Sequence, residues 1–268
     1  LKARLQTLNT RTSKPNDIWK PKDEHEVRCL PYPHGGDPMI DLHFHYEIGD
    51  NPAILCPKAN FAKDCAVCDF CDVLKSWKGP DGQDKAESDR KADFEIFKKI
   101  QAKARVFVPI VVRGEEATGA KFWGVTPKQA DAILEVCTDG DRLSELGIDQ
   151  SDAEKALNVV FAPEKAYDLK VSFKKAGEKG NTTSYSNVEI KGKIKPVPLA
   201  KDKKAIEAIL STVKNIREVY PEISSDEVQK MVDRWIGSLN RDESKTAAPA
   251  TEKYETKSTE KVAQTGRS

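Results

Sequence analysis

The chain has 268 residues, of which 38% are hydrophobic and 32% are charged, with 44 Lys and Arg against 43 Asp and Glu. This composition fits a globular fold of one or two domains with some polar chain outside the core. No stretch approaches the roughly 18 apolar residues of a membrane span, and the first residues form no apolar signal segment, so we expect neither membrane insertion nor secretion. The net charge of +1 at first argues against a polyanionic partner.

The first part of the chain predicts a basic arm, a strand and a helix. Residues 1–13 form the arm, with three basic residues and no acidic residue. Apolar and polar residues alternate over 40–48, which predicts a strand. We expect Ile40, Leu42, Phe44, Tyr46 and Ile48 on one face and Asp41, His43, His45 and Glu47 on the other. A helix is expected over 65–77, where apolar residues recur at helical spacing before a Gly-Pro pair.

The remaining elements alternate between short strands and helices. Residues 79–93 are polar and are predicted to form a loop. Strands are expected at 103–113, 120–125, 157–162, 166–175 and 184–195, with Pro109 indicating an edge or a bulge in the first of them. Helices are expected from Thr126-Pro127, over 206–216, and over 224–239 behind a capping box of Ser224 and Glu227. From residue 244 the chain lacks periodicity and is predicted to be disordered.

The order of these elements indicates a fold class. Several short strands occur with a few helices and without regular βαβ alternation. This pattern favours a small mixed barrel, an α+β fold that is mainly β, over a doubly wound sheet.

Cysteine and histidine residues cluster within a short part of the sequence: His43, His45, Cys56, Cys65, Cys68 and Cys71. Thiolate and imidazole are the ligands that Zn²⁺ prefers, and a C-x2-C pair can present both sulfurs to one tetrahedral centre. The sequence therefore predicts one structural zinc ion. We favour the set His45, Cys56, Cys65 and Cys68, with His43 and Cys71 as alternative ligands. Buried thiols without a metal are the less favoured interpretation.

A catalytic zinc site is the competing interpretation of the same residues. His45 and Glu47, with Cys65 and Cys68 downstream, partly match the H-x-E and C-x-x-C halves of the zinc deaminase signature. Asp64 stands where that signature has Pro, and a fourth thiolate would close the coordination position that catalysis needs. We therefore expect a protein that is not an enzyme, with a deaminase-like enzyme or a structural zinc-ribbon protein as alternatives.

Charge is unevenly distributed along the chain. Residues 94–113 hold five basic residues against one acidic residue, and residues 165–195 hold eight against three. Residues 131–155 instead hold eight acidic residues against two basic ones. Aromatic residues accompany both basic stretches, and basic strands with aromatic side chains are typical of surfaces that bind single-stranded nucleic acid. The near-zero net charge thus excludes only a uniformly basic protein.

Local sequence resembles the single-stranded DNA-binding (helix-destabilising) proteins of T-even-like phages. The resemblance covers about residues 17–200 and rests on IWKPK and EVRCLP, a strand ending in a ligand His, a Cys, and CAVC leading into a helix. FEIFKKIQAKARVFVPIVV, AKFWGVTPKQADAIL and YDLKVSFKK follow in matching order. It implies an OB-fold-like barrel with an inserted zinc subdomain at about 43–77, single-stranded DNA in the cleft between them, and roles in phage DNA replication, recombination and repair. His45 matches the ligand His of the family.

The resemblance also implies an organisation and partners. The DNA-binding core would span 14–200, in the cytoplasm of the infected host cell. After the core, the sequence itself predicts a helical segment at 201–240 and a disordered tail at 241–268. Lys2 and Arg4 of the arm would mediate cooperative self-association along DNA. Candidate DNA-binding residues, from the resemblance and from the basic and aromatic stretches together, are Lys98, Lys99, Lys103, Arg105, Phe107, Lys121, Trp123, Lys174 and Tyr185. The family's acidic tail, which recruits replication proteins, has no counterpart here, because residues 244–268 hold five basic residues against three acidic ones.

Overall fold

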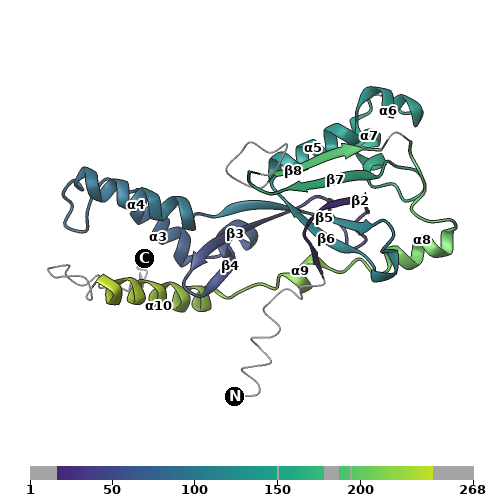
Figure 1. Ribbon diagram of the computed structural model, residues 1–268. Helices are drawn as coiled ribbons and strands as arrows, with labels where there is room; N and C mark the ends of the chain where they lie inside the picture. Colours follow the sequence, from purple (N-terminus) through teal and green to yellow (C-terminus); the bar gives the residue numbers. More distant parts are fainter. Residues whose placement is uncertain (1–16, 150, 178–186, 194, 244–268) are drawn as a thin grey trace, which may run out of the picture.

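The computed structural model describes residues 17–149, 151–177, 187–193 and 195–243 and has a mixed α+β architecture (Figure 1). The strands are β1 (Ile18–Trp19), β2 (Glu24–Cys29), β3 (Ile40–Ile48), β4 (Asn51–Leu55), β5 (Lys103–Val112), β6 (Lys121–Val125), β7 (Leu169–Lys174) and β8 (Asn187–Gly192). The helices are α2 (Pro57–Phe61), α3 (Ala66–Lys75), α4 (Glu87–Ile100), the 3-10 helix η1 (Glu116–Thr118), α5 (Pro127–Cys137), α6 (Gly140–Glu145), α7 (Ala153–Val160), α8 (Lys203–Leu210), α9 (Ile216–Val219) and α10 (Ser225–Glu243).

One mixed sheet contains all of these strands, in the order β1-β6-β5-β2-β7-β8, with β3 pairing with both β4 and β5. Only β1 and β6 pair in parallel among the described strands. The expected α+β class with a mainly β sheet is therefore confirmed. The path ends at β1 and β8, so the described strands form an open sheet and do not close into the expected barrel.

Strand β5 connects the two ends of the molecule. Its first half pairs with β3 up to Phe107, and its second half pairs with β2 from Ile110 onward, while β6 runs along its other side. Pro109 lies where the partner changes from β3 to β2, so its missing N–H interrupts neither ladder. The expectation that Pro109 marks an edge strand is wrong, because β5 is paired on both sides.

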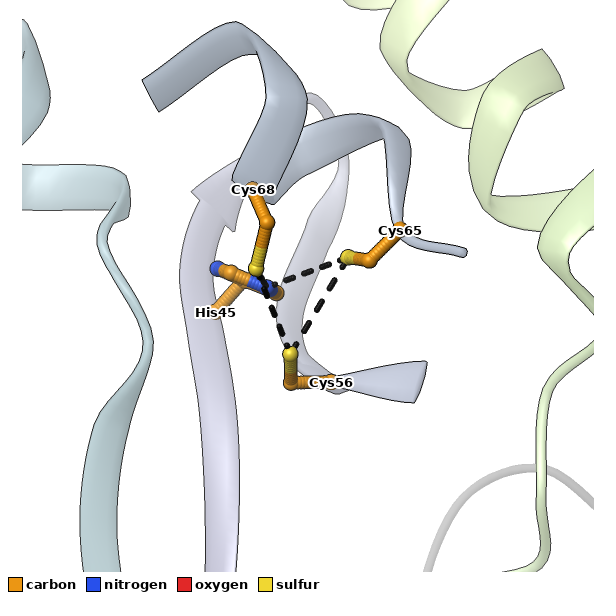
Figure 2. Close-up of side chains that lie close together, drawn as sticks. All are labelled: His45, Cys56, Cys65 and Cys68. Atoms are coloured by element: carbon orange, nitrogen blue, oxygen red, sulfur yellow. Dashed lines mark hydrogen bonds between the residues drawn. The ribbon is translucent and has the colours of Figure 1, made fainter. Parts of the chain in front are cut away.

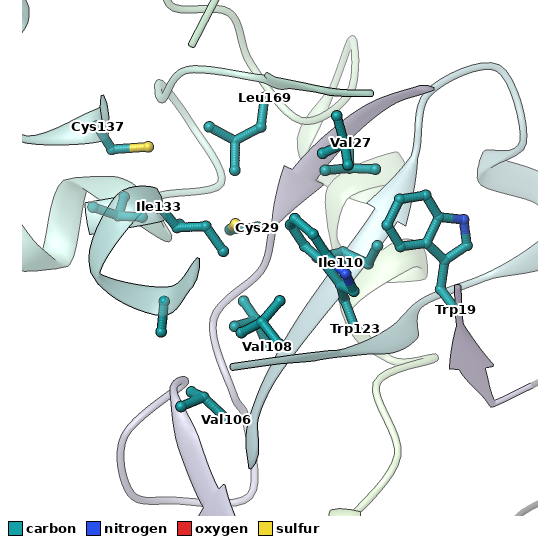
Figure 3. Packing of buried hydrophobic residues seen from close by; sticks show 14 of the residues in the cluster. Trp19, Val27, Cys29, Val106, Val108, Ile110, Trp123, Ile133, Cys137 and Leu169 are labelled. Carbon is teal, nitrogen blue, oxygen red and sulfur yellow. The ribbon is translucent and has the colours of Figure 1, made fainter. Parts of the chain in front are cut away.

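The side chains of β5 alternate between two hydrophobic cores. Val106, Val108 and Ile110 face the main core, which β2, β6 and β7 share with α5 and α7 (Figure 3). Phe107 and Val111 point the other way, into smaller clusters completed by residues of α8 and α9 and the chain between them. The expected helix start at Thr126-Pro127 is confirmed, and the structure adds a capping box there, in which Thr126 and Gln129 bond reciprocally.

A third core fills the other end of the molecule, between β3, β4, α3, α4 and α10. Helix α10 contributes Val228 and Val232, which are almost fully buried there. The expected Ser224 to Glu227 cap at its start is confirmed. In Figure 1, α10 runs beside α3 and α4, away from α5–α8. The first predicted C-terminal helix, at 206–216, is divided instead into α8 and α9.

Two segments differ from the sequence prediction. Residues 87–93 of the predicted loop and residues 94–100 of the predicted basic strand form α4, whose Glu87 and Asp89 at the start and Lys98 and Lys99 at the end complement the helix dipole. The predicted strand at 157–162 lies mostly in α7. In both segments, apolar residues that alternate locally also fit a helical period, and packing against neighbouring helices decides between them.

Arg113 also has a different role from the one predicted. It was expected on a basic binding strand, yet it bonds to Asp168, which accepts a second ion pair from the fully buried Arg28. Both guanidinium groups also donate to backbone carbonyls, those of Ala166 and Val197 from Arg28 and that of Leu199 from Arg113. Burial lowers the pKa of Arg28 and Asp168 opposes that shift. The cluster ties the chain around 166–168 and 197–199 to β2 and β5.

Candidate functional site

Four side chains converge behind strand β3: His45, Cys56, Cys65 and Cys68 (Figure 2). Their ligand atoms all lie within 4.8 Å of one another. Three of the four residues are buried, and Cys68 is partly exposed. A His and three Cys at these distances could hold one metal ion. This is the set of residues that the sequence favoured.

Local structure explains why these four residues meet. His45 and Ile54 are cross-strand partners on β3 and β4, so their side chains share a face, and Cys56 continues that face two residues later. Cys56 then caps α2, where its sulfur accepts a hydrogen bond from the N–H of Ala59. Cys65 caps α3, and Cys68 lies in the first turn of that helix. The hairpin thus supplies two ligands and the start of α3 the other two.

The distances match tetrahedral coordination. Zn–S bonds of about 2.3 Å and Zn–N bonds of about 2.0–2.1 Å place tetrahedral ligand atoms about 3.5–3.8 Å apart. The Cys56 sulfur lies 4.0 Å from that of Cys65 and 3.5 Å from that of Cys68. The Nε2 atom of His45 lies 3.4 Å from the Cys65 sulfur and 3.6 Å from the Cys68 sulfur. The donor set and its spacing both fit zinc.

Neighbouring groups orient the ligands. Nδ1 of His45 lies 2.7 Å from the carbonyl oxygen of Ile100 at the end of α4. Nδ1 must donate in this bond, which leaves the lone pair of Nε2 directed at the sulfurs. Hydrogen bonds with Cys65 and Cys68 hold the pKa of Cys56 below its usual range. Hydrogen bonds with Cys56 and Cys65 raise the pKa of Cys68. A bound cation would remove the remaining thiol protons.

The alternative ligands lie outside the cluster. Cys71 is one turn further along α3 and is buried in the hydrophobic core of that end of the molecule, where desolvation raises the pKa of its thiol to about 11. His43 is on the same side of β3 as His45, but only its backbone groups are bonded to the ligand segment, to Cys56 and Asn60. Among the described residues, neither joins the four that converge.

Strand β3 presents a different chemistry on its opposite face. Leu42 and Phe44 are buried there and Tyr46 is partly exposed, as the alternation predicted. Ile48 was expected with them, yet it packs in the core that contains the metal ligands. Glu47 explains the change, because its φ of 61° places it in the left-handed region and reverses the alternation.

Aromatic and basic side chains gather on this opposite face. We define the aromatic–basic face as Tyr46, Phe61, Lys103, Arg105, Arg217 and Tyr220. The Nε of Arg105 donates to the hydroxyl of Tyr46 at 3.4 Å, and the guanidinium of Arg217 lies 4.7 Å from the ring centroid of Phe61. Lys103 and Arg105 of β5 stand opposite Phe44 and Leu42 of β3. Tyr220 follows α9 and packs on Phe44.

The cations of the aromatic–basic face have no carboxylate partner within the described part of the chain. Lys103, Arg105 and Arg217 form none of the ion pairs found among residues 17–149, 151–177, 187–193 and 195–243. The basic hairpin of β7 and β8 is different. Its lysines Lys170, Lys174, Lys191 and Lys193 pair with Glu24, Glu189 or Glu26. Among the residues that the structure describes, the aromatic–basic face therefore carries unpaired cations where β7 and β8 carry paired ones.

The predicted DNA-binding residues are divided between surfaces. Lys103 and Arg105 belong to the aromatic–basic face, while Lys98 and Lys99 are exposed on the last turn of α4. Lys121 lies across from Ile110 on the side of β5 that faces the main core, and it is near Glu115. Lys174 lies on the β7–β8 hairpin and pairs with Glu189. Tyr185, Lys2 and Arg4 lie outside the described residues.

Two predicted stacking residues are buried. Phe107 is 4% exposed between Phe44 and Tyr220, and Trp123 is 2% exposed against Trp19. Neither ring offers a face to a base in this structure, so the prediction that they stack on bases is wrong for this conformation. The alternation of Phe107 with Arg105 was recognised correctly, but the helix that covers Phe107 comes from residues more than a hundred positions away.

Sequence reasoning missed three members of the aromatic–basic face: Phe61, Arg217 and Tyr220. Phe61 is followed by a left-handed Ala62 at the end of α2, which gave no periodic signal. Arg217 and Tyr220 stood beside a predicted apolar helix stripe. Their proximity depends on tertiary packing and is not visible in local sequence.

No protein-family model matches the sequence, and no curated protein is significantly similar to it. Within the described part of the chain, no helix combines the length and the apolar character that crossing a membrane requires.

Proposed function

We propose that this protein binds single-stranded DNA without sequence specificity, on the aromatic–basic face, and that a structural zinc ion braces that face from behind. The observation that carries the proposal is a set of three cations, interleaved with partly exposed aromatic rings, that have no carboxylate partner among the described residues: Lys103, Arg105 and Arg217. Cations of this kind bind phosphates, and neighbouring rings stack on bases of any sequence. The resemblance to the phage single-stranded DNA-binding proteins supports the same assignment.

The proposal extends to the wider role that the resemblance implies. We assign the protein to phage DNA replication, recombination and repair, with an OB-fold-like sheet that carries the zinc subdomain as an insertion. Lys2 and Arg4 would support self-association along the strand. Replication proteins would be further partners.

The metal centre supports a structural zinc more than a catalytic one. Three sulfurs and one nitrogen supply four ligands, which leaves no coordination position for a reacting water. Glu47, the proton-transfer residue of a deaminase-like site, is exposed and adopts a positive φ, away from the buried ligands. When bound, zinc would hold the β3–β4 hairpin to the start of α3, and the side chains of the chain itself would contact DNA.

A salt titration of poly(dT) binding tests the proposal. Wild-type protein should bind poly(dT) more tightly than duplex DNA, because stacking requires unpaired bases. Each phosphate contact contributes about 0.7 to the slope of log K against log salt on single strands. Arg105→Ala and Arg217→Ala should each weaken binding and reduce that slope by about one contact.

Lys170→Ala provides the matched control. It removes a lysine that already pairs with Glu24 on the β7–β8 hairpin, so it should leave the slope unchanged. Equal slopes for wild type, Arg105→Ala and Arg217→Ala would exclude this face as the binding site. Absence of binding even at low salt would overturn the function itself and favour a structural zinc-ribbon protein. Release of ammonia from cytidine or adenosine, lost in Glu47→Ala, would establish the deaminase alternative.

A further inference from the structure

Exposed apolar side chains concentrate on one part of the molecule. Of the four large hydrophobic residues that are exposed in the described chain, Val73, Trp77 and Phe94 belong to α3, the turn after it and α4, and only Val197 lies elsewhere. Trp77 is 70% exposed and Phe94 is 52% exposed. Exposed apolar side chains that gather on one surface mark an interaction site, whereas single ones are ordinary, so this surface indicates a binding function.

Each aromatic ring of this surface is accompanied by a cation. The Arg90 guanidinium lies 4.6 Å from the ring centroid of Trp77, and the Lys98 ammonium lies 5.2 Å from that of Phe94. Phe97 stacks on Phe94 with ring centroids 6.0 Å apart. Arg90 forms no ion pair with any described residue, and its Nε is buried without a hydrogen-bond partner. Its charge is therefore available to an anion.

Helical spacing arranges these residues in a line. Arg90, Phe94 and Lys98 are four residues apart on α4, so they lie above one another on the same side of the helix. Trp77 lies beside the outer end of this line through its contact with Arg90. The inner end is the last turn of α4, three residues before Lys103 of the aromatic–basic face begins β5. We name Trp77, Arg90, Phe94 and Lys98 the α4 stripe.

We propose that the α4 stripe is an outer subsite for single-stranded DNA, continuous with the aromatic–basic face, in which Trp77 and Phe94 stack on bases and Arg90 contacts phosphates, while Lys98 is paired with Glu95 at 2.6 Å. This inference rests on the proposed function. Alternation of cations and exposed rings along one line matches the needs of a strand whose bases and phosphates alternate. A protein partner would fit the apolar side chains but would not require the cation beside each ring.

Oligonucleotides of different length distinguish binding to the aromatic–basic face from binding to the α4 stripe. We would measure affinities of oligothymidylates from about 4 to about 16 nucleotides, the range of site sizes seen for single OB folds. Arg105→Ala should weaken binding at every length. Trp77→Ala and Phe94→Ala should leave the shortest oligonucleotides unaffected and weaken the longest by about five-fold to 150-fold, the value of one lost stacking contact. Trp77→Phe, which keeps a ring, should restore most of the loss.

Val197→Ala removes an exposed apolar side chain far from the stripe and serves as the control, with no effect expected at any length. Trp77 is also the most exposed of the indoles, so its fluorescence should be quenched by long oligonucleotides but not by the shortest. Failure of wild-type protein to bind any length would overturn the proposed function. If wild type binds every length and Trp77→Ala and Phe94→Ala bind the longest equally well, only the outer subsite is overturned, and a protein is then the occupant of this surface.

Discussion

His45 and Tyr46 are adjacent residues of β3 whose side chains lie on opposite faces of the strand. The side chain of His45 joins the three sulfurs behind the strand, and that of Tyr46 accepts a bond from Arg105 in front of it. Adjacent residues on a strand must point to opposite faces, so fixing the position of one also fixes the other. The bond from His45 to the Ile100 carbonyl connects the same strand to α4. A metal ion held by His45 would therefore order the binding face without touching DNA.

Cys65 and Cys71 provide a matched pair for testing the metal ligands. Purified protein should contain one zinc per chain. Cys65→Ser should lose the metal and lower the melting temperature, because formation of the site is coupled to folding. Cys71→Ser should keep the zinc, since this thiol lies in the hydrophobic core and outside the cluster. Metal analysis and thermal denaturation would measure both effects. Loss of zinc in Cys71→Ser with retention in Cys65→Ser would contradict the assignment.

Asp168 is the shared partner of the buried Arg28 and the partly exposed Arg113, so its removal should lower the stability of the protein. Asp168→Asn leaves Arg28, which is fully buried, and Arg113 without their negative charge. Breaking a buried ion pair in this way costs about 3–5 kcal/mol of unfolding free energy. Urea denaturation would measure it, with Asp131→Asn on the exposed side of α5 as the control. A loss below about 0.5 kcal/mol, the range of ordinary surface changes, would show that the cluster does not hold the chain.

At the scale of elements, α10 completes the core of one end of the molecule. We call this end, formed by β3, β4, α3, α4 and α10 around the four candidate ligands, the metal-binding end. Its Val228 and Val232 join the core that contains Cys56, Cys65 and Cys71, and its Trp235 packs edge-on against Phe70. A C-terminal helix of this kind could equally have been a docking arm with an unpartnered face, and the sequence left that choice open. Its burial in the structure means that the metal-binding end depends on residues about 170 positions after Cys56.

The same substitution at two valines tests this role of α10. Val228→Ala should lower the unfolding free energy by about 2 kcal/mol, because the buried side chain leaves a cavity in that core. Val73→Ala, on the exposed side of α3, should change it by less than about 0.5 kcal/mol. Helix propensity affects both changes equally, so their difference reports burial. Equal values from urea denaturation would show that α10 does not stabilise this core.

Local chemistry determined which elements the sequence could predict. The β3 strand and the starts of α3 and α5 depend on patterns within a few residues, and the four converging ligands lie within one short part of the sequence, from His45 to Cys68. Helix α4 was missed because Phe94, Ile96 and Ile100 fit a strand as well as a helix, and α3 and β3 decide the outcome by packing. The burial of Phe107 by Tyr220 and the closing of the core by α10 depend on long-range contacts, for which a single sequence holds no local signal.

At the scale of the whole molecule, the basic residues differ in whether an acidic residue pairs with them, although basic and acidic residues are nearly equal in number. The lysines of the β7–β8 hairpin pair with Glu189 of β8 and with Glu24 and Glu26 of the neighbouring β2, whereas Lys103, Arg105 and Arg217 remain unpaired among the described residues. The near-zero net charge is therefore compatible with a local cationic surface. Steering of DNA should depend on these few cations, and not on the total charge of the chain.

Strand β5 joins the metal-binding end to the main sheet, so removal of the metal should affect DNA binding at a distance. Without zinc, no metal ion would connect the β3–β4 hairpin to α3. Strand β3 would then be held less firmly, and Lys103 and Arg105 of β5 pair with this strand. We expect chelation to reduce poly(dT) affinity by about tenfold or more, the usual scale for losing a supporting interaction at a metal site. Fluorescence titration before and after chelation would measure it.

Adding the metal back distinguishes reversible loss of zinc from irreversible damage to the protein during chelation. Added Zn²⁺ should recover the affinity, whereas Mg²⁺ should not, since three thiolates and an imidazole suit a borderline-soft cation and not a hard one. Cys71→Ser protein should lose and regain affinity in parallel with wild type. Metal-free protein that binds poly(dT) with unchanged affinity would show that the aromatic–basic face is ordered by packing with α9 alone, without help from the candidate ligands on the opposite face of β3.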